Sequence, residues 1–217
     1  MKKKEKKFIA DLKSYNEITF IGPLFSKPLL LPRNESPFLF IDGGCHNFAD
    51  VKSNYLKSFK NFLFLKLGDQ DSYDGELDLV LEKSKDFSDL AYGLGLIANT
   101  IQTISLQGFL GGRKDHELFN LGEVHHFLSS SKAHKNCSVS FEKTFQAFPR
   151  GTQQIDHQGT FSLFVLEKTL IQIEGNAQYT LKSPTLFNPL SSMGLSNIGN
   201  GSFTITSQGP FFLYFQD

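Results

Sequence analysis

Residues 62–72 read FLFLKLGDQDS, a pattern that is informative about the fold class. Phe62 to Leu67 is a short and mostly apolar run, typical of a buried strand, and it leads through a glycine into two aspartates. Three more buried strands, each bounded by Gly, Pro or Asp, are predicted at Ile18–Ile21, Phe38–Ile41 and Ile101–Leu106. Apolar residues spaced by three and four predict amphipathic helices at Phe48–Phe59, Phe87–Ala98 and His116–Leu128. Strands that alternate with helices predict an α/β unit, a mostly parallel sheet flanked by helices.

The second half of the chain follows a different pattern. Ser129 to Asn136 is a polar, serine-rich stretch, and the helical periodicity stops there. After it come short alternating runs separated by turn residues, at Ser138–Phe141, Thr160–Leu166, Leu170–Ile173, Gln178–Leu181, Ser202–Thr206 and Phe211–Phe215. The sequence therefore predicts two domains, an α/β domain over residues 1–130 and an all-β sandwich or open barrel over residues 137–217.

The composition excludes several classes of protein. With 217 residues, 40% of them hydrophobic and 20% charged, the chain can bury enough apolar surface to fold as a globular protein. Lys2 to Lys7 hold five lysines and one glutamate, a local charge of +4, so the rest of this neutral chain carries −4. Because the body is mildly acidic and the chain has few arginines, we expect no binding to nucleic acid.

The sequence also bears on compartment. Phe8 to Glu17 is interrupted by charged residues such as Asp11, so the lysine-rich start is not followed by the apolar core of a signal peptide. No apolar run approaches the roughly 18 residues of a membrane helix. Cys45 and Cys137 are too few for a disulfide framework and lack metal-ligand spacing. We therefore expect a soluble cytoplasmic protein with reduced thiols and no membrane partner.

Aspartates gather in one part of the chain, where six of the twelve lie between Asp69 and Asp89. Asp69 and Asp71 are two apart in an extended segment, so they can present two carboxylates at the carboxyl end of a strand, where α/β proteins bind ligands. Asp86 and Asp89 stand three apart at the start of a predicted helix. These two acidic pairs have no evident compensating charge, and Mg²⁺ bound to a nucleotide would relieve their repulsion. A structural interpretation stays open, with Asp86 as a helix N-cap, Asp89 at N3 and GDQDS as a solvated turn.

Two segments contain glycines after predicted strands. Gly108 to His116 reads GFLGGRKDH and opens a helix, and its backbone amides, the helix N-terminus and Arg113 all suit a phosphate group. Asp42, Gly43 and Gly44 end another strand and, taken alone, are equally compatible with a turn.

In this order the motifs resemble those of the thiamine pyrophosphokinase family. That family carries DGG after an early strand, then GDxDS, KDxTD and GGRxDH, and a β-rich tail with an SN dipeptide. The matching segments here are Asp42–Gly44, Gly68–Ser72, Lys85–Asp89, Gly111–His116 and Ser196–Asn197. Ser88 replaces the usual threonine, and Ile198 stands where bacterial members often have an acidic residue.

The resemblance implies a homodimer of subunits with an N-terminal α/β domain and a C-terminal β-sandwich, with the site between subunits. It also implies transfer of the terminal pyrophosphoryl group of ATP to the hydroxyl of thiamine, with release of AMP. By motif, Asp69, Asp71 and Asp89 would hold Mg²⁺ on the nucleotide. Catalytic roles would fall to Asp71, Asp89, Arg113, Asp115 and His116. The other residues that the resemblance assigns to nucleotide or acceptor binding are Asp42, Gly43, Gly44, Ser72, Asp86, Ser88, Gly111, Gly112, Tyr179, Ser196 and Asn197.

Fewer residues define the acceptor. In the family an aromatic residue before a turn of the β domain stacks on thiamine, and Tyr179 matches this place, although it is also compatible with a plain strand position. The departures in the tail keep open a pyrophosphokinase with a different acceptor. A third interpretation is a non-catalytic dimer that binds a nucleotide or thiamine. The intact acidic clusters and Arg113 weigh against it.

Overall fold

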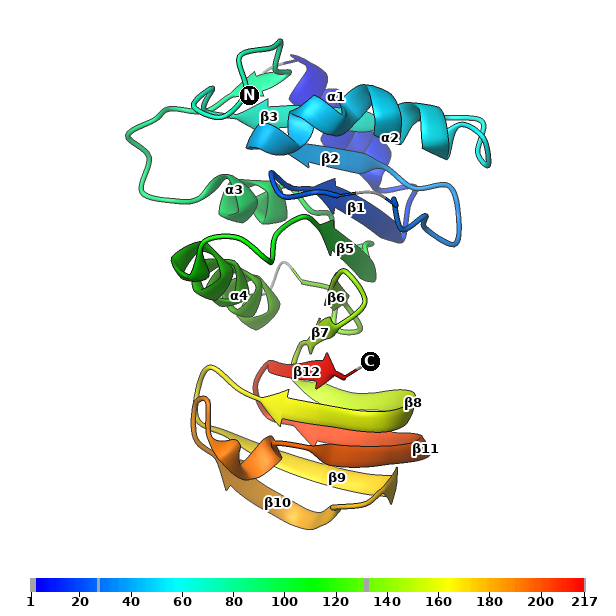
Figure 1. Ribbon diagram of the computed structural model, residues 1–217, viewed down its shortest axis with the longest axis vertical. Helices are drawn as coiled ribbons and strands as arrows, with labels where there is room; N and C mark the ends of the chain where they lie inside the picture. The colour runs from blue at the N-terminus through cyan, green and yellow to red at the C-terminus, as the bar shows by residue number, and fades with distance from the viewer. Residues whose placement is uncertain (1–2, 27, 131–132, 217) are drawn as a thin grey trace.

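The computed structural model describes residues 3–26, 28–130 and 133–216, which form one twelve-stranded sheet with helices around its first half (Figure 1). Lys2 of the lysine-rich start and residues 131–132 of the serine-rich stretch lie outside the described residues. The strands are, in chain order, β1 Glu17–Ile21, β2 Phe38–Ile41, β3 Phe64–Gly68, β4 Leu79–Val80, β5 Thr103–Gln107, β6 Ser138–Phe141, β7 Phe145–Phe148, β8 Gly151–Phe164, β9 Thr169–Ala177, β10 Leu181–Phe187, β11 Asn197–Ser207 and β12 Phe211–Phe215. Their order in the sheet is β10-β9-β11-β8-β12-β7-β6-β5-β1-β2-β3-β4.

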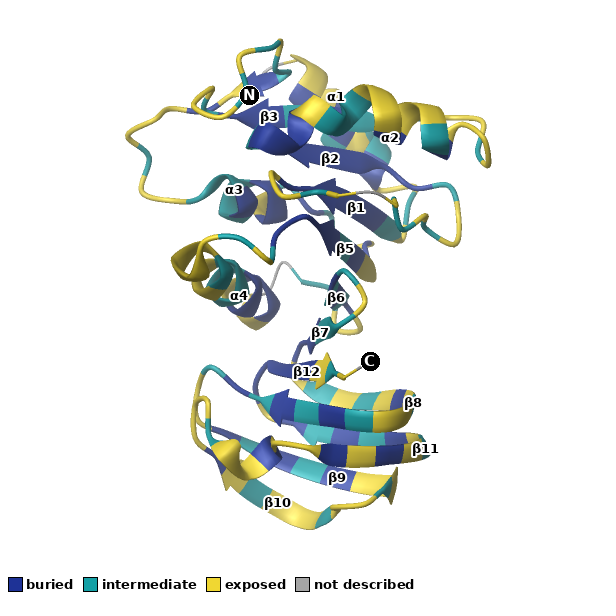
Figure 2. Ribbon diagram, viewed as in Figure 1, coloured by how far each residue is buried: buried dark blue, intermediate teal, exposed yellow. Residues whose placement is uncertain are grey.

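The strands of the first half pair in parallel, from β6 through β5, β1, β2 and β3 to β4. Helices α1 (Lys3–Leu12), α3 (Asp89–Gly95) and α4 (Lys114–Ser129) pack against residues of one face, while α2 (Phe48–Tyr55) packs against residues of the other. Phe20 thus belongs to one core and its neighbour Ile21 to the other. Burial on both faces explains why β2 is apolar at every position (Figure 2).

The strands of the second half pair antiparallel, in the order β7-β12-β8-β11-β9-β10. Inward-facing residues form their own core, in which the ring of Phe161 stacks on that of Phe203 with 4.8 Å between centroids. Buried and more exposed residues alternate along β11, as expected for a sheet with one covered face (Figure 2).

β6 and β7 connect the two halves. β6 pairs in parallel with β5 and antiparallel with β7, so the hydrogen-bonded sheet continues past the serine-rich stretch. The prediction of a mixed α/β protein is confirmed. The division into two domains and the β-sandwich stay predictions.

β4 and β7 were not predicted, β1, β3, β5, β9 and β11 differ from the predicted runs in their bounds, and two further predicted strands differ more. Gln178–Leu181 is a bend over residues 178–180 that leads into β10, because Tyr179 bonds to the side chain of Asn197 instead of joining a ladder. β8 begins at Gly151 instead of Thr160. The first half of β8 is too polar to be read as a buried run. It is nevertheless paired with β11, and this pairing extends from Gly151 to Phe161.

The helices also differ in their bounds. The helix predicted from Phe48 ends at Tyr55, and the one predicted from Phe87 begins at Asp89. α1 was not predicted from the sequence, because its lysines surround a narrow buried stripe, which includes Phe8 and Leu12. None of the helices in the described ranges is long and apolar enough to cross a membrane.

Truncation of a side chain in the core of the antiparallel half gives a first prediction. Phe161 is fully buried, so Phe161→Ala should lower the free energy of unfolding by about 3–5 kcal/mol through lost burial and a residual cavity. Urea denaturation followed by circular dichroism measures the change. The matched control is Phe119→Ala on α4, where the side chain is 70% exposed and the expected change is within about 0.5 kcal/mol. Equal effects of the two substitutions would contradict the core assignment.

Candidate active site

The carboxyl ends of β1, β2, β3 and β5 meet at one edge of the sheet, where a cavity of about 400 Å³ opens. Chain order reverses here, because β2 and β3 lie on one side of β1 and β5 on the other. Such a reversal is where α/β sheets bind ligands. All four motifs of the first half contribute to the lining, which includes Asp42, Asp69, Asp71, Ser72, Lys85, Ser88, Asp89, Arg113 and His116.

Three carboxylates form the centre of this cavity. Asp42, Asp69 and Asp71 each offer one oxygen, and these oxygens lie within 4.8 Å of one another. Asp42 Oδ1 is buried and has no hydrogen-bond partner among the described residues. Burial, together with the nearby negative charges, raises the pKa of Asp42. Clustered hard oxygen atoms, one of them unsatisfied, are the donor set that suits Mg²⁺.

The backbone that carries these carboxylates is tightly constrained. Asp42 itself has a positive φ of 50° and begins the short 3₁₀ turn η1 (Asp42–Asn47) that contains Gly43 and Gly44. A Cβ on Gly44 would lie 2.2 Å from the carbonyl oxygen of Ile21, so only glycine lets this turn lie against the end of β1. Strained backbone at a cluster of charges is a feature of functional sites.

The GDQDS segment is a tight turn as well as a carboxylate site. Asp69 Oδ1 accepts a hydrogen bond of 3.3 Å from the backbone N–H of Asp71, and Gln70 between them has a φ of 63°. The hydroxyl of Ser72 donates to Asp71 Oδ1 at 2.9 Å. The turn that the structural interpretation predicted is therefore present, and it aims both carboxylates into the cavity.

Lys85 supplies the compensating charge that the sequence analysis did not find. Its Nζ lies 2.8 Å from Asp69 Oδ2 and 3.0 Å from Asp89 Oδ1. Burial alone would raise the pKa of Asp69, but the hydrogen bond and charge of Lys85 lower it. For Asp89 burial prevails and the pKa is raised. The expectation of two uncompensated acidic pairs is wrong, and the position of Lys85 directly before Asp86 was the available signal.

The start of α3 differs from its predicted cap. Ser88 is the N-cap, and its hydroxyl accepts a hydrogen bond of 3.0 Å from the backbone N–H of Ala91. The same hydroxyl donates to Glu123 of α4 at 3.2 Å. Asp89 is the first residue of α3, so the alternative with Asp86 as N-cap and Asp89 at N3 is wrong.

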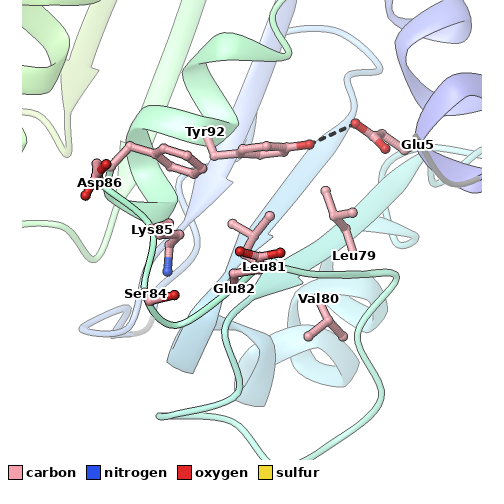
Figure 3. A pocket seen from close by; sticks show the side chains of 10 residues that line it. Glu5, Leu79, Val80, Leu81, Glu82, Ser84, Lys85, Asp86 and Tyr92 are labelled. Carbon is pink, nitrogen blue, oxygen red and sulfur yellow. Dashed lines mark hydrogen bonds between the residues drawn. The ribbon is translucent and has the colours of Figure 1, made fainter.

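Asp86 lies in a neighbouring cavity of about 590 Å³ (Figure 3). Tyr92 crosses this cavity and donates a hydrogen bond of 3.0 Å to Glu5 of α1. Lys85 lines both cavities, whereas Asp86 is absent from the lining of the carboxylate cavity.

The loop before α4 pairs its charged groups with one another. Arg113 Nε donates to Asp115 Oδ1 at 3.1 Å, and the backbone N–H of Gly111 donates to Glu117 at 2.6 Å. The bond from Arg113 lowers the pKa of Asp115 to about 2. Gly111 has a φ of 95°, a conformation that favours glycine, and Gly112 follows it before the helix. Arg113 and His116 line the carboxylate cavity, so the predicted cationic side of the site is present.

Tyr179, Ser196 and Asn197 lie together, but in a different place. Asn197 bonds to the backbone of Tyr179, and Ser196 directly precedes β11. Five strand steps separate β11 from β5, a path of about 24 Å along the sheet at about 4.8 Å per step. None of the three lines the carboxylate cavity. Figure 1 shows β9 and β11 at the opposite end of the long axis from β2 and β3.

Comparison with known proteins gives a fold. No family model and no curated protein matches this sequence. Among solved structures, the thiamine pyrophosphokinase of Bacillus subtilis matches with a TM-score of 0.66 and 16% identity, over 93% of this chain and 99% of that chain. The thiamin pyrophosphokinase of Geobacillus thermodenitrificans has a TM-score of 0.65 and 17% identity, over 93% and 98%. That of Candida albicans has a TM-score of 0.61 and 12% identity, over 96% and 91%.

The fold and the site first define a class of protein. It is a mixed α/β protein with one large sheet and a carboxylate cavity at the ends of the strands. More narrowly, the chain has the fold of the thiamine pyrophosphokinases. The resemblance stated from the motifs is thus confirmed at the level of the fold.

The unsatisfied carboxylate gives a second prediction. The pKa of Asp42 is raised in the folded state, so the protonated carboxyl group favours folding. This contribution to stability is fully present below the ordinary pKa of 3.8, and it is lost as the pH rises through the raised pKa. Asp42→Asn removes the charge and should raise the melting temperature at pH 7, without divalent cations, by about 2–4 °C. Thermal melts between pH 3 and pH 7 measure the difference, which should vanish at the acid end.

Two comparisons make this prediction specific to Asp42. The exposed Asp74, in the loop between β3 and β4, provides the control substitution Asp74→Asn, which should leave the melting temperature unchanged. Added Mg²⁺ should stabilise the natural chain more than Asp42→Asn. A loss of stability at pH 7 in Asp42→Asn would contradict the assignment of an uncompensated charge.

Proposed function

We propose that this protein is a thiamine pyrophosphokinase, which transfers the pyrophosphoryl group of ATP to the hydroxyl of thiamine and releases AMP. The observation that carries the proposal is the carboxylate trio of Asp42, Asp69 and Asp71, with its unsatisfied oxygen, in a cavity that residues of all four motifs line. The fold of the solved thiamine pyrophosphokinases supports it.

The donor set fits Mg²⁺. Asp69 and Asp71 would hold the ion as the motif implies, and Asp42 joins them because its oxygen lies in the same cluster. Asp89 is paired with Lys85 at 3.0 Å, and it would act on the metal site by holding that lysine in place. Bound there, the ion would neutralise the charge of the nucleotide phosphates.

The protein's own groups would orient the phosphate chain. Arg113 and His116 also line the cavity and would bind phosphate oxygens, with Asp115 holding the guanidinium of Arg113 in place. In the transfer, a bond forms between the thiamine hydroxyl oxygen and the β-phosphorus. The bond from the β-phosphorus to the oxygen that bridges it to the α-phosphorus breaks, AMP leaves with that oxygen, and the proton of the hydroxyl passes to solvent water. Positioning and charge neutralisation supply most of the catalysis in such a reaction.

The acceptor side would come from a second copy of the chain. The separation of Tyr179, Ser196 and Asn197 from the carboxylate cavity supports a homodimer in which each copy covers the other's cavity. In this proposal residues 1–130 form the catalytic domain. Residues 137–217 form a β-sandwich for thiamine binding and dimerisation, supported by their own apolar core. Free and buried Cys45 and Cys137 support a reducing, cytoplasmic location.

One observation favours a second candidate, a pyrophosphokinase with another acceptor. Ile198, beside Asn197, is 36% exposed and apolar where bacterial members of the family often carry an acid. Competition between thiamine and other hydroxyl-bearing heteroaromatic compounds for pyrophosphoryl transfer distinguishes the two candidates.

Product analysis gives the third prediction. With ATP, Mg²⁺ and thiamine the protein should form AMP and thiamine diphosphate in equal amounts and no ADP, because two phosphates move together. Chromatographic separation of the nucleotides measures this. Asp71→Asn should lower turnover at least about a hundredfold by removing a charge at the metal, without a cavity. The control Asp156→Asn makes the same chemical change at an exposed position of β8 and should retain full activity. ADP as the main product would overturn the proposal.

Complementation gives the fourth prediction. Asp71→Asn and Tyr179→Ala damage different half-sites, so a mixed dimer should contain one intact site and recover up to about half of the natural activity per dimer. Differently tagged chains allow the mixed dimer to be purified and assayed. Activity no higher than that of the two variants alone, in verified mixed dimers, would show that one chain builds the site.

A further inference from the structure

Tyr179 combines exposure with tight restraint. Its side chain is 60% exposed, yet its hydroxyl accepts a hydrogen bond of 3.2 Å from Gln178 Nε2. Its backbone lies in the bend over residues 178–180, between β9 and β10. An aromatic ring that is held in place while its face stays open is suited to stacking.

The restraint on the backbone comes from one side chain. Asn197 is only 6% exposed, and its Oδ1 accepts hydrogen bonds from the backbone N–H groups of Tyr179 at 2.9 Å and Ile198 at 2.8 Å. Its Nδ2 donates to the carbonyl oxygen of Tyr179 at 2.8 Å. Three of the four bonds that an amide side chain can make are therefore used inside the protein.

The bend has little other support from the sheet. β10 pairs with β9 from Leu181 onward, and the bend before it has one backbone bond of 2.8 Å, from Gln178 to the carbonyl of Ile198. Ser196, at a φ of 56°, turns the chain into β11 directly before Asn197. The side chain of Asn197 therefore supplies the hydrogen bonds to the bend that a neighbouring strand supplies within a sheet.

We propose that Asn197 is a positioning residue for Tyr179, and that it presents the ring to the acceptor without contacting the acceptor itself. The identity of the acceptor rests on the proposed function, whereas the restraint rests on the bonds above. A side-chain amide that satisfies buried backbone groups cannot turn to a ligand without leaving them unpaired. Because the bend is ordered before the ligand binds, the binding free energy is not reduced by the entropy cost of ordering it.

The absence of tryptophan from this sequence allows a direct test. Tyr179→Trp places a single tryptophan on the bend, and its fluorescence anisotropy reports local motion with no ligand present. Adding Asn197→Ala should lower this anisotropy. Adding Asn197→Asp should lower it less, because the carboxylate keeps both acceptor bonds and loses only the donor. The control Asn200→Ala, at an exposed position of the same strand, should leave it unchanged.

Kinetics in the chain with its natural Tyr179 complete the test. Asn197→Ala should raise the KM for thiamine about tenfold and leave the KM for ATP unchanged, with Asn197→Asp in between. Circular dichroism melts confirm folding, and Asn197→Asp carries the test if Asn197→Ala does not fold.

The outcomes separate the two claims. Unchanged anisotropy in both Asn197 variants, whatever their KM for thiamine, overturns the positioning role. A higher KM with unchanged anisotropy would mean that Asn197 contacts the acceptor directly. If the natural chain does not convert thiamine, the proposed function fails, and the ligand-free anisotropy still decides the role of Asn197.

Discussion

Three carboxylates within 4.8 Å of one another repel, and the first half of the protein holds them together. β2 is apolar and fully buried, β3 is mostly apolar and partly buried, and the two strands fix the points from which Asp42 and the GDQDS turn start. Lys85 offsets part of the charge through Asp69. The buried strands stabilise the fold enough for Asp42 to keep one oxygen without a hydrogen bond. A plain turn would not need this arrangement, so the cost points to a ligand.

The change of pairing at β6 determines where the other functional residues lie. Parallel strands need crossover connections, which gather the loops after β1, β2, β3 and β5 at one edge. The antiparallel strands instead place their turns at both ends, and the Tyr179 bend lies at one of them. A sheet that holds two half-sites several strands apart cannot bring them together within one flat layer. Under the proposed function a two-fold pair of chains resolves this, because each copy offers both halves.

The sequence predicted the features whose causes are local. β2, β6 and β12 have the predicted bounds because each is an apolar or alternating run between turn residues. The meeting of the four motifs of the first half at one edge followed from the general behaviour of α/β sheets. Contacts between segments that are distant in the sequence could not be predicted. Lys85 pairs with Asp69, 16 residues away, and Asn197 holds Tyr179 from 18 residues away. For Lys85 the sequence signal was its position directly before Asp86, whereas local spacing gives no sign of the contact between Asn197 and Tyr179.

The polar groups of the site pair with one another, so ligand binding under the proposed function would be an exchange of partners. Arg113 and Asp115 are exposed, and an exposed ion pair contributes little, so a phosphate can replace Asp115 at small cost. Lys85 is only 9% exposed and bonded to two carboxylates, so separating it costs more. A phosphate chain alone would add negative charge beside Asp42, Asp69 and Asp71. Under the proposed function, a divalent cation that accompanies the phosphates would remove that repulsion, with Asp42 among the residues that would hold it and Arg113 binding phosphate oxygens. Under the proposed function, this arrangement of charges would therefore suit a metal–phosphate complex better than either component alone.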